Sequence, residues 1–431
     1  MRILNTRNKN FQQSFRKIVK RGEDNIKDVE AVVRGILEEV KVNGDRALVR
    51  LTEKLDKHKL RIKDLKISEQ TIQNSCKKTD PAVLSSLKKA CQRIENFHRR
   101  QVQQSWISAE PSGAILGQMV QPLEKVGIYV PGGKALYPSS VLMNAIPARV
   151  AGVKEIIMVS PGTRAGINPM LLAAADICGI KKIYQIGGAQ AVAALAYGTA
   201  SVPKVDKIVG PGNMYVATAK RLVYGAVDID MVAGPSEILI IADGSGSPAY
   251  AAADMLSQAE HDEMACAMLL TPDEAFARSA AKELAAQLKR LQRQQIAARA
   301  LEQHGAIIIT RTIPEALQLA NEVAPEHLEL AVERPWELVP QIRNAGAVFL
   351  GHYSPEALGD YMAGPNHVLP TGGTARFFSP LAVEDFLKKT SIICFTRDAL
   401  RAVAPDIKRL ARAESLDAHA RSVEQRLKKH S

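Results

Sequence analysis

Residues 126–152, VGIYVPGGKALYPSSVLMNAIPARVAG, pass from a β-rich run through a glycine turn into an amphipathic helical run. The same order recurs in EIIMVSPG and NPMLLAAADICG, in IYQIGG and AQAVAALAYG, and in KIVGPG and NMYVATAKRLVYG. Serial strand–turn–helix units predict a mainly parallel sheet with right-handed crossovers, because parallel neighbours need a long connection. This part of the chain therefore predicts an α/β fold.

A glycine stands at the carboxyl end of each of these predicted strands. Ligands of open α/β sheets bind at those ends, where glycine lets a backbone approach closely and the next helix offers free N–H groups to an anion. The G-x-G-x-x-G dinucleotide fingerprint is missing, and IGGAQA and GPGN do not replace it. Spacing alone is therefore compatible with a nucleotide site and does not establish one.

A second α/β region follows GPSEILIIADGSGSP, with strands expected in AMLLTP, GAIIITRT, LELAV, AGAVFLGHY and SIICFTRD. The N-terminal region and the tail are helical in spacing and highly charged. We expect two doubly wound, incomplete Rossmann-like domains with helical extensions at both termini. The expected boundaries are 1–110 for the N-terminal region, which packs partly with the second α/β domain, then 114–235, 236–380, and 381–431 for a strand and helical tail.

Composition argues against several classes of protein. Apolar residues make up 46% and charged residues 24%, as in an ordinary soluble globular protein. We find no signal peptide and no apolar run near the roughly 18 residues that cross a bilayer. The 5 scattered cysteines favour a reducing, cytoplasmic compartment. The net charge of +12 is spread along amphipathic helices, so we expect neither a nucleic-acid nor a membrane partner.

Two short motifs carry polar residues in unusual company. In LSQAEHDEM, Gln258 and His261 stand three apart in a predicted helix and would share a face, although an exposed face with an ordinary histidine explains them as well. In VAPEHLELAV, Pro325 is expected to start a helix or end a turn. Glu326 and His327 then point apart and could serve two proton transfers, unless Glu326 is a cap and His327 incidental.

Two further segments add acids and histidines. SPEALGDYMAGPNHVLPTGG, with Asp360 and His367, is predicted to be a long functional loop. AESLDAHA, with Glu414 and His419, is by itself an amphipathic helix. Oxygen and nitrogen donors such as these suit a borderline metal such as zinc, but their separation in sequence leaves open whether they meet. The donors in question are Gln258, His261, Asp360 and His419.

Taken in order, nine strings resemble the motifs of the histidinol dehydrogenase family. They are VGIYVPGGKALYPSSVLMNAIPARVAGV, GGAQAVAALAYGT, GPGNMYVATAK, GPSEILIIAD, LSQAEHDE, APEHLEL, AGAVFLG, GDYMAGPNHVLPTGGTARFFSPL and AHARSVEQR. The resemblance implies NAD-dependent oxidation of L-histidinol through L-histidinal to L-histidine, the last two steps of histidine biosynthesis. It covers nearly the whole chain and is weakest before about residue 110.

The resemblance also implies site residues and partners. It implies one zinc per subunit, with the NAD side in 114–235 and the catalytic and metal side in 236–380. It further implies an intertwined homodimer whose tail reaches the partner's active site. The implied metal ligands are Gln258, His261, Asp360 and His419. The implied substrate contacts are Ser236, Gln258, His261, His327, Asp360, His367, Glu414 and His419. The implied NAD contacts are Tyr129, Gln190 and Asn213.

The residue types suggest which side chains would carry out the proton transfers of such a reaction. His327 suits removal of the hydroxyl proton, and Glu326 suits activation of the water that hydrates the aldehyde. The rival route for aldehyde oxidation is a cysteine thiohemiacetal. However, Cys178, Cys266 and Cys394 lie in apolar segments, where thiols are expected to be buried and inert. Two different functions stay open beside this one: a relative acting on another amino alcohol or hydroxylated substrate, and a basic scaffold or RNA-binding protein with a degenerate site.

Overall fold

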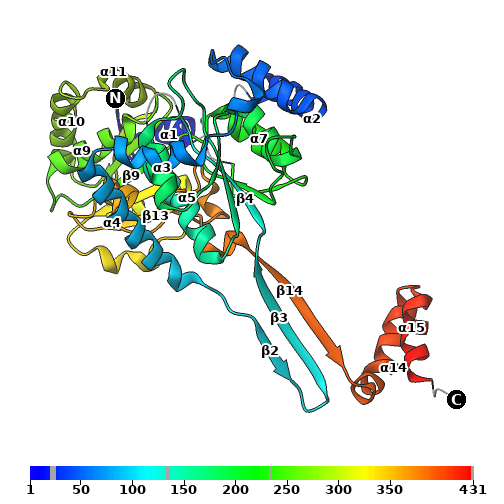
Figure 1. The fold of residues 1–431 in the computed structure, drawn as a ribbon. Coiled ribbons are helices and arrows are strands. Elements are labelled where there is room, and N and C mark those ends of the chain that lie inside the picture. Colours follow the sequence, from blue (N-terminus) through cyan, green and yellow to red (C-terminus); the bar gives the residue numbers. More distant parts are fainter. Residues whose placement is uncertain (20–25, 133–135, 233, 429–431) are drawn as a thin grey trace. The chain divides into compact units, whose positions relative to one another are not determined.

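The structure, a computed structural model, describes residues 1–19, 26–132, 136–232 and 234–428. The chain forms two compact units, which we describe separately (Figure 1). The first unit comprises Met1–Gln101 and Leu123–Phe386, and the second comprises Val102–Pro122 and Leu387–Ser431. Gly133 of the first predicted turn and parts of the basic terminal segments lie outside the described residues.

A five-stranded parallel sheet in the first unit confirms the predicted α/β class. Its order is β6-β5-β4-β7-β8, so β5 and β6 lie on one side of β4, and β7 and β8 lie on the other. The strands are β4 (Lys125–Tyr129), β5 (Glu155–Val159), β6 (Lys182–Tyr184), β7 (Lys207–Val209) and β8 (Asp228–Ile229). The helices between them are α5 (Pro138–Ala151), α6 (Pro169–Ile177), α7 (Gly188–Tyr197) and α8 (Met214–Val223).

Apolar clusters cover both faces of this sheet. Ile128 belongs to the cluster that includes α5 and α6, whereas its neighbour Tyr129 belongs to the cluster that includes α7 and α8. Successive strand residues point to opposite faces, so a strand buried on both sides is apolar throughout. The N-terminal helices form the outer layers, with α3 and α4 on the first cluster and α2 on the second. These helices are α2 (Ile26–Asp56, interrupted at Gly44), α3 (Glu69–Lys78) and α4 (Pro81–His98).

A second parallel sheet has the order β1-β11-β10-β9-β12-β13. Helices α9, α10 and α11 cover one face, and α1 and α12 cover the other. Of the described residues in the N-terminal region, those of β1 and α1 join this sheet. Its strands are β1 (Arg2–Asn5), β9 (Glu237–Ala242), β10 (Cys266–Thr271), β11 (Ala306–Ile309), β12 (His327–Ala331) and β13 (Ala347–Leu350). Its helices are α1 (Phe11–Val19), α9 (Pro248–Ala259), α10 (Glu274–Leu288), α11 (Gln294–His304) and α12 (Ile313–Val323).

The second unit contains a three-stranded antiparallel sheet that the sequence analysis did not predict. Its order is β14-β3-β2, built from β2 (Trp106–Ala109), β3 (Ala114–Pro122) and β14 (Leu387–Phe395), followed by α14 (Arg397–Ala413) and α15 (Asp417–Leu427). The strand in SIICFTRD therefore pairs with β3 and not with the parallel strands. Residues 114–122, expected at the start of the first α/β domain, likewise belong to the second unit. Local sequence identifies a strand, but its partner depends on distant parts of the chain.

Two local expectations also change. The segment expected to be an irregular loop contains a short helix, α13 (Glu356–Tyr361). Helix α9 ends at Ala259, and His261 follows its C-cap residue in a turn closed by the Gln258 carbonyl. None of the helices in the described part of the chain combines the length and apolarity needed to span a bilayer.

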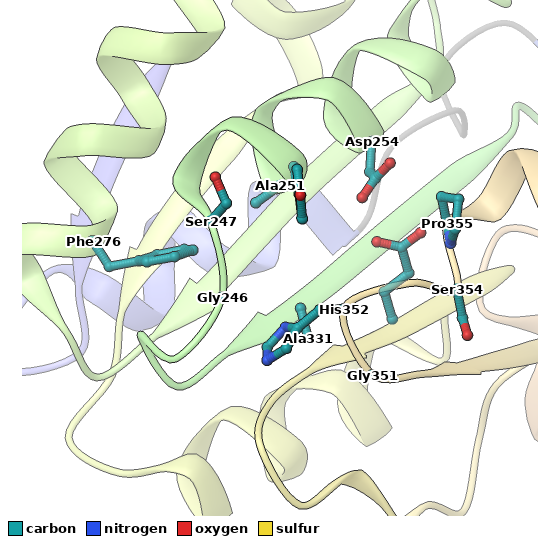
Figure 2. Close-up of a pocket in the computed structure, with 12 residues that line it drawn as sticks. Gly246, Ser247, Ala251, Asp254, Phe276, Ala331, Gly351, His352, Ser354 and Pro355 are labelled. Atoms are coloured by element: carbon teal, nitrogen blue, oxygen red, sulfur yellow. The ribbon is translucent and has the colours of Figure 1, made fainter.

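A buried carboxyl group, Glu329, and a half-buried one, Asp254, lie between β12 and α9. Glu329 shares a strand face with His327, because side chains two apart on a strand point the same way. Its carboxyl group hydrogen-bonds to Asp254 of α9. Figure 2 shows Asp254 pointing from its helix toward the strands. The pocket that both residues line has a volume of about 20 Å³, which is room for about one water molecule and not for a larger ligand.

Burial raises the pKa of both carboxyl groups. The pKa of Asp254 rises from 3.8 to about 6, chiefly because the charged form is poorly solvated. The pKa of Glu329 lies well above its usual range because of burial and the neighbouring Asp254 charge. The folded chain therefore holds protons that the unfolded chain releases at lower pH, and folding becomes less favourable as pH rises.

We expect the free energy of unfolding to fall between about pH 4 and pH 7. The stability that these groups contribute is complete below their unfolded pKa values, and it is lost as pH rises through about 6 for Asp254. Its share is on the order of 3 kcal/mol, at about 1.4 kcal/mol per pKa unit. Urea unfolding across this pH range should give a flatter profile for Asp254→Asn and an unchanged profile for the exposed control Asp406→Asn. An unchanged slope in Asp254→Asn would contradict the assignment.

Candidate active site

The side chains of Glu326 and His327 are held against the first residue of β9. Helix α12 ends at Val323, and Ala324 adopts a left-handed conformation with φ of 52°. Pro325 therefore follows the end of a helix, and β12 begins at His327. The Glu237 backbone N–H donates to Glu326 Oε2 at 2.8 Å, and His327 Nδ1 lies 2.9 Å from the Glu237 carbonyl oxygen. Parallel pairing of β9 with β12 thus fixes both groups.

His327 is arranged as a base. Its Nδ1 faces two acceptors, the Glu237 carbonyl oxygen and Gln258 Oε1, the latter at 3.0 Å. This network assigns the proton to Nδ1 and leaves the lone pair on Nε2. Burial lowers the pKa of His327, which keeps the imidazole neutral at neutral pH. A neutral imidazole with a free Nε2 can accept a proton.

Glu326 is also buried, and its pKa lies well above the usual range. Burial is the main cause, and the hydrogen bond from the Glu237 N–H opposes it. Its Oε2 lies 3.7 Å from His327 Nδ1. A carboxylate with a raised pKa is a stronger base than an exposed glutamate, so Glu326 and His327 form a buried pair able to move protons.

Three further side chains form a donor group that could hold a cation. His261, Glu356 and Asp360 each offer one ligand atom, and these atoms lie within 4.8 Å of one another. Glu356 and Asp360 are four apart on α13 and so share a face, whereas His261 comes from the turn after α9. Glu356 was not predicted from the sequence, although its spacing of four from Asp360 was an available signal.

His367 and Asp360 form a linked pair beside this group. His367 Nδ1 lies 3.5 Å from Asp360 Oδ1, and His367 Nε2 lies 3.3 Å from the Ser140 hydroxyl on α5. Burial alone would raise the pKa of Asp360, but the hydrogen bond and charge of His367 outweigh it, so the pKa is lowered. Asp360 therefore presents a carboxylate. Asp360 also lines a mainly apolar cavity of about 380 Å³ between α4, α5 and α13.

The predicted metal and substrate residues fall into three groups. Gln258, His261, His327, Asp360 and His367 are joined by the contacts described above. Ser236 directly precedes β9, and its carbonyl accepts from the Cys266 N–H at 3.0 Å. Glu414 and His419 are exposed residues of the second unit, at the end of α14 and in α15. Their approach to an active site, His419 as a metal ligand and Glu414 as a substrate contact, stays a prediction.

The cysteines differ partly from expectation. Cys178 and Cys266 are buried, and burial raises the pKa of the Cys178 thiol, as expected for an inert thiol. Cys394 is exposed, because β14 carries it on a sheet whose residues are largely solvent-accessible. The expectation that Cys394 is buried was therefore wrong.

The predicted NAD contacts lie at the carboxyl ends of the first sheet. Tyr129 ends β4, and its buried hydroxyl accepts from the Gly188 N–H at 3.1 Å. Gln190 lies in the first turn of α7 and donates to Asp56 Oδ2 at 3.3 Å. Asn213 caps α8 by accepting from two backbone N–H groups. The strand order reverses at β4 and β7, where open α/β sheets bind ligands.

A buried ion pair fixes the loop that follows β7. Lys220 and Asp230 pair with almost no solvent exposure. Lys220 Nζ donates to the Gly210 carbonyl at 2.9 Å, and Asp230 Oδ2 accepts from the Gly210 N–H at 2.8 Å. Gly210 has φ of 109°, and a Cβ there would lie 2.2 Å from the Tyr129 carbonyl oxygen. The pair therefore holds the glycine loop close against the end of β4.

Known proteins match this chain over nearly its whole length. Residues 19–427 match the family described as histidinol dehydrogenase. The histidinol dehydrogenase of Geobacter sulfurreducens is 54% identical over 99% of this chain and 100% of its own length. That of Listeria innocua is 53% identical over 94% of each chain. The crystal structure of histidinol dehydrogenase from Elizabethkingia anophelis is similar at a TM-score of 0.93 with 38% identity, covering 99% of this chain and 98% of that one. With sequence and fold in agreement from end to end, this chain belongs to the histidinol dehydrogenase family.

Proposed function

We propose that this chain oxidises L-histidinol to L-histidine through L-histidinal, using NAD and a zinc-assisted active site in the last two steps of histidine biosynthesis. Family membership supports histidinol oxidation. The observation that carries the finer proposal is the buried His327, which keeps a proton on Nδ1 and a lone pair on Nε2 beside Glu326.

The donor chemistry fits zinc. Gln258, His261, Asp360 and His419 would supply nitrogen and oxygen ligands, which a borderline cation accepts. His261 and Asp360 already lie in the close donor group, which supports this assignment. When bound, zinc would bind the imidazole and amine of histidinol and position its carbinol carbon.

The first sheet supports an NAD site at its carboxyl edge. The order β6-β5-β4-β7-β8 is 3-2-1-4-5 in chain order, the arrangement of a doubly wound nucleotide-binding sheet. Tyr129, Gln190 and Asn213 would contact NAD, which accepts hydride when bound. The fixed Gly210 loop would let the cofactor approach the backbone closely.

His327 and Glu326 would carry out the proton transfers. His327 Nε2 takes the hydroxyl proton of histidinol, returns it to the carbonyl oxygen as water adds to the aldehyde, and then takes a hydroxyl proton of the hydrate. The resulting imidazolium is stabilised at Nδ1 by the Glu237 carbonyl and Gln258 Oε1. Glu326 takes the proton of the attacking water. Ser236, His367 and Glu414 would contact the substrate.

We also propose that the enzyme is an intertwined homodimer in which Glu414 and His419 enter the partner's site. Both residues belong to the second unit, which exposes large apolar side chains such as Ile393, 73% exposed, and Leu410, 64% exposed. Surface of this kind is typical of protein interfaces. A subunit contact would remove it from water.

The first test is the NADH yield with limiting histidinol. We expect two NADH per histidinol, because the alcohol and the aldehyde are each oxidised by two electrons. A chelator should abolish the yield, and added zinc should restore it. A yield of one NADH with accumulating aldehyde, or a yield that survives chelation, would contradict the proposal.

The division of roles between His327 and Glu326 predicts a selective defect in Glu326→Gln. Glutamine still accepts from the Glu237 N–H but takes no proton from water. We expect the first hydride transfer to be retained within a few-fold and aldehyde oxidation to fall by roughly 10²–10⁴-fold. Single-turnover stopped-flow with histidinol and with histidinal separates the steps, with exposed Glu337→Gln as the control. Equal loss in both half-reactions would refute the assigned roles.

The Lys220–Asp230 ion pair, which fixes the Gly210 loop, predicts a selective effect of Lys220→Met on cofactor binding. The substitution removes the donor to the Gly210 carbonyl, so the KM for NAD should rise by roughly tenfold, the equivalent of a hydrogen bond to a charged group. The KM for histidinol should change little. Lys207→Met is the matched control, because Lys207 is also buried and paired but does not bond to the loop. Thermal unfolding checks that the variant folds, and an equal rise in both KM values would contradict the prediction.

A further inference from the structure

Glu356 is a buried carboxylate that the proposed mechanism does not use. Its side chain is 1% exposed at the start of α13. Oε2 accepts from the Ser257 hydroxyl at 2.7 Å, and the Glu356 backbone N–H donates to Glu329 Oε1 at 2.7 Å. Both ends of the residue are thereby held in place, one from α9 and one from β12.

The other carboxylate oxygen, Oε1, is buried without a hydrogen-bond partner. An unpartnered buried oxygen on a carboxyl group is costly unless a cation or water satisfies it. Glu356 also offers an oxygen within 4.8 Å of the ligand atoms of His261 and Asp360. The unsatisfied carboxylate and the close donor group are two independent observations that point to the same occupant.

We propose that Glu356 is itself a ligand of the metal, so that His261, Glu356 and Asp360 form a binding group supplied entirely by the first unit. This inference rests on the proposed metal site and concerns the protein without substrate, where Glu356 adds one residue to that site. Histidinol would displace Glu356 when it binds, because zinc does not hold four other protein ligands, two substrate donors and a further carboxylate at once. One imidazole and two carboxylates are a donor set that zinc accepts. A cation among these groups also offsets the repulsion between the Glu356 and Asp360 carboxylates.

The arrangement has a consequence for metal retention. A donor group from one unit can bind the ion without a ligand from the tail. His419→Ala should therefore still bind zinc, whereas Glu356→Gln should bind it more weakly. Ser257 would act as a positioning residue, because its hydroxyl holds Oε2 and so aims Oε1.

The experiment measures zinc affinity without substrate or NAD. Metal-stripped full-length protein competes with a chromophoric chelator for zinc. We expect a single zinc per wild-type chain and a 10–100-fold weaker affinity or more in Glu356→Gln, since even groups that only contact a ligand change affinity by roughly that factor. Exposed Glu337→Gln is the matched control and should bind as wild type.

A second readout separates direct ligation from an indirect effect. In Co²⁺-loaded protein, the visible d–d spectrum should change in Glu356→Gln, because the ion loses a carboxylate oxygen. It should keep its shape in Ser257→Ala, where the carboxylate remains. Glu356→Asp keeps the charge on a shorter side chain and should give an intermediate affinity, which tests the proposal even if Glu356→Gln folds poorly.

The outcomes distinguish this inference from the proposed function. Stoichiometric zinc in wild type with an unchanged affinity and Co²⁺ spectrum in Glu356→Gln would overturn the assignment of Glu356 alone. A wild-type chain that binds no zinc would overturn the metal site and this inference together. Weaker zinc binding with a changed spectrum in Glu356→Gln would support the assignment.

Discussion

The candidate active site depends on the parallel pairing of β9 with β12. This pairing places the backbone of Glu237 beside the side chains of Glu326 and His327, and it satisfies one polar atom of each. Buried polar groups are stable only when they are hydrogen-bonded, so the strand register fixes both the position of the carboxyl group and the tautomer of the imidazole. The chemistry proposed for the pair follows from that tautomer.

The predicted ligand-binding residues lie at the carboxyl ends of the strands in one parallel sheet of the first unit and at the amino ends in the other. The predicted cofactor contacts follow the carboxyl ends of β4, β6 and β7. Glu326 and His327 instead lie at the amino end of β12, beside the amino end of β9. A hydrogen bond between His367 and Ser140, which follows β4 on α5, joins the surroundings of the two regions. Helix starts and glycine loops thus suit the cofactor, while buried acids and imidazoles suit the metal and substrate.

Carboxyl groups are unusually concentrated around β12, α9 and α13. Asp254, Glu329 and Glu356 all have raised pKa values, with burial as the largest cause for each. Asp360 differs because His367 beside it stabilises the charged form. Burial of this many acids lowers stability near neutral pH, and a bound cation would recover part of that loss.

The sequence alone determined the α/β class, the four strand–turn–helix units, and the adjacency of Glu326 and His327, because each follows from the order and spacing of residues along a short stretch of chain. The tertiary structure decided which strands pair, where a helix ends and which distant side chains meet. It paired SIICFTRD with β3, ended α9 before His261, and brought Glu356 to Asp360 and His261. Hydrogen-bond register and burial depend on residues far apart in the chain, and no local pattern encodes a distance between them.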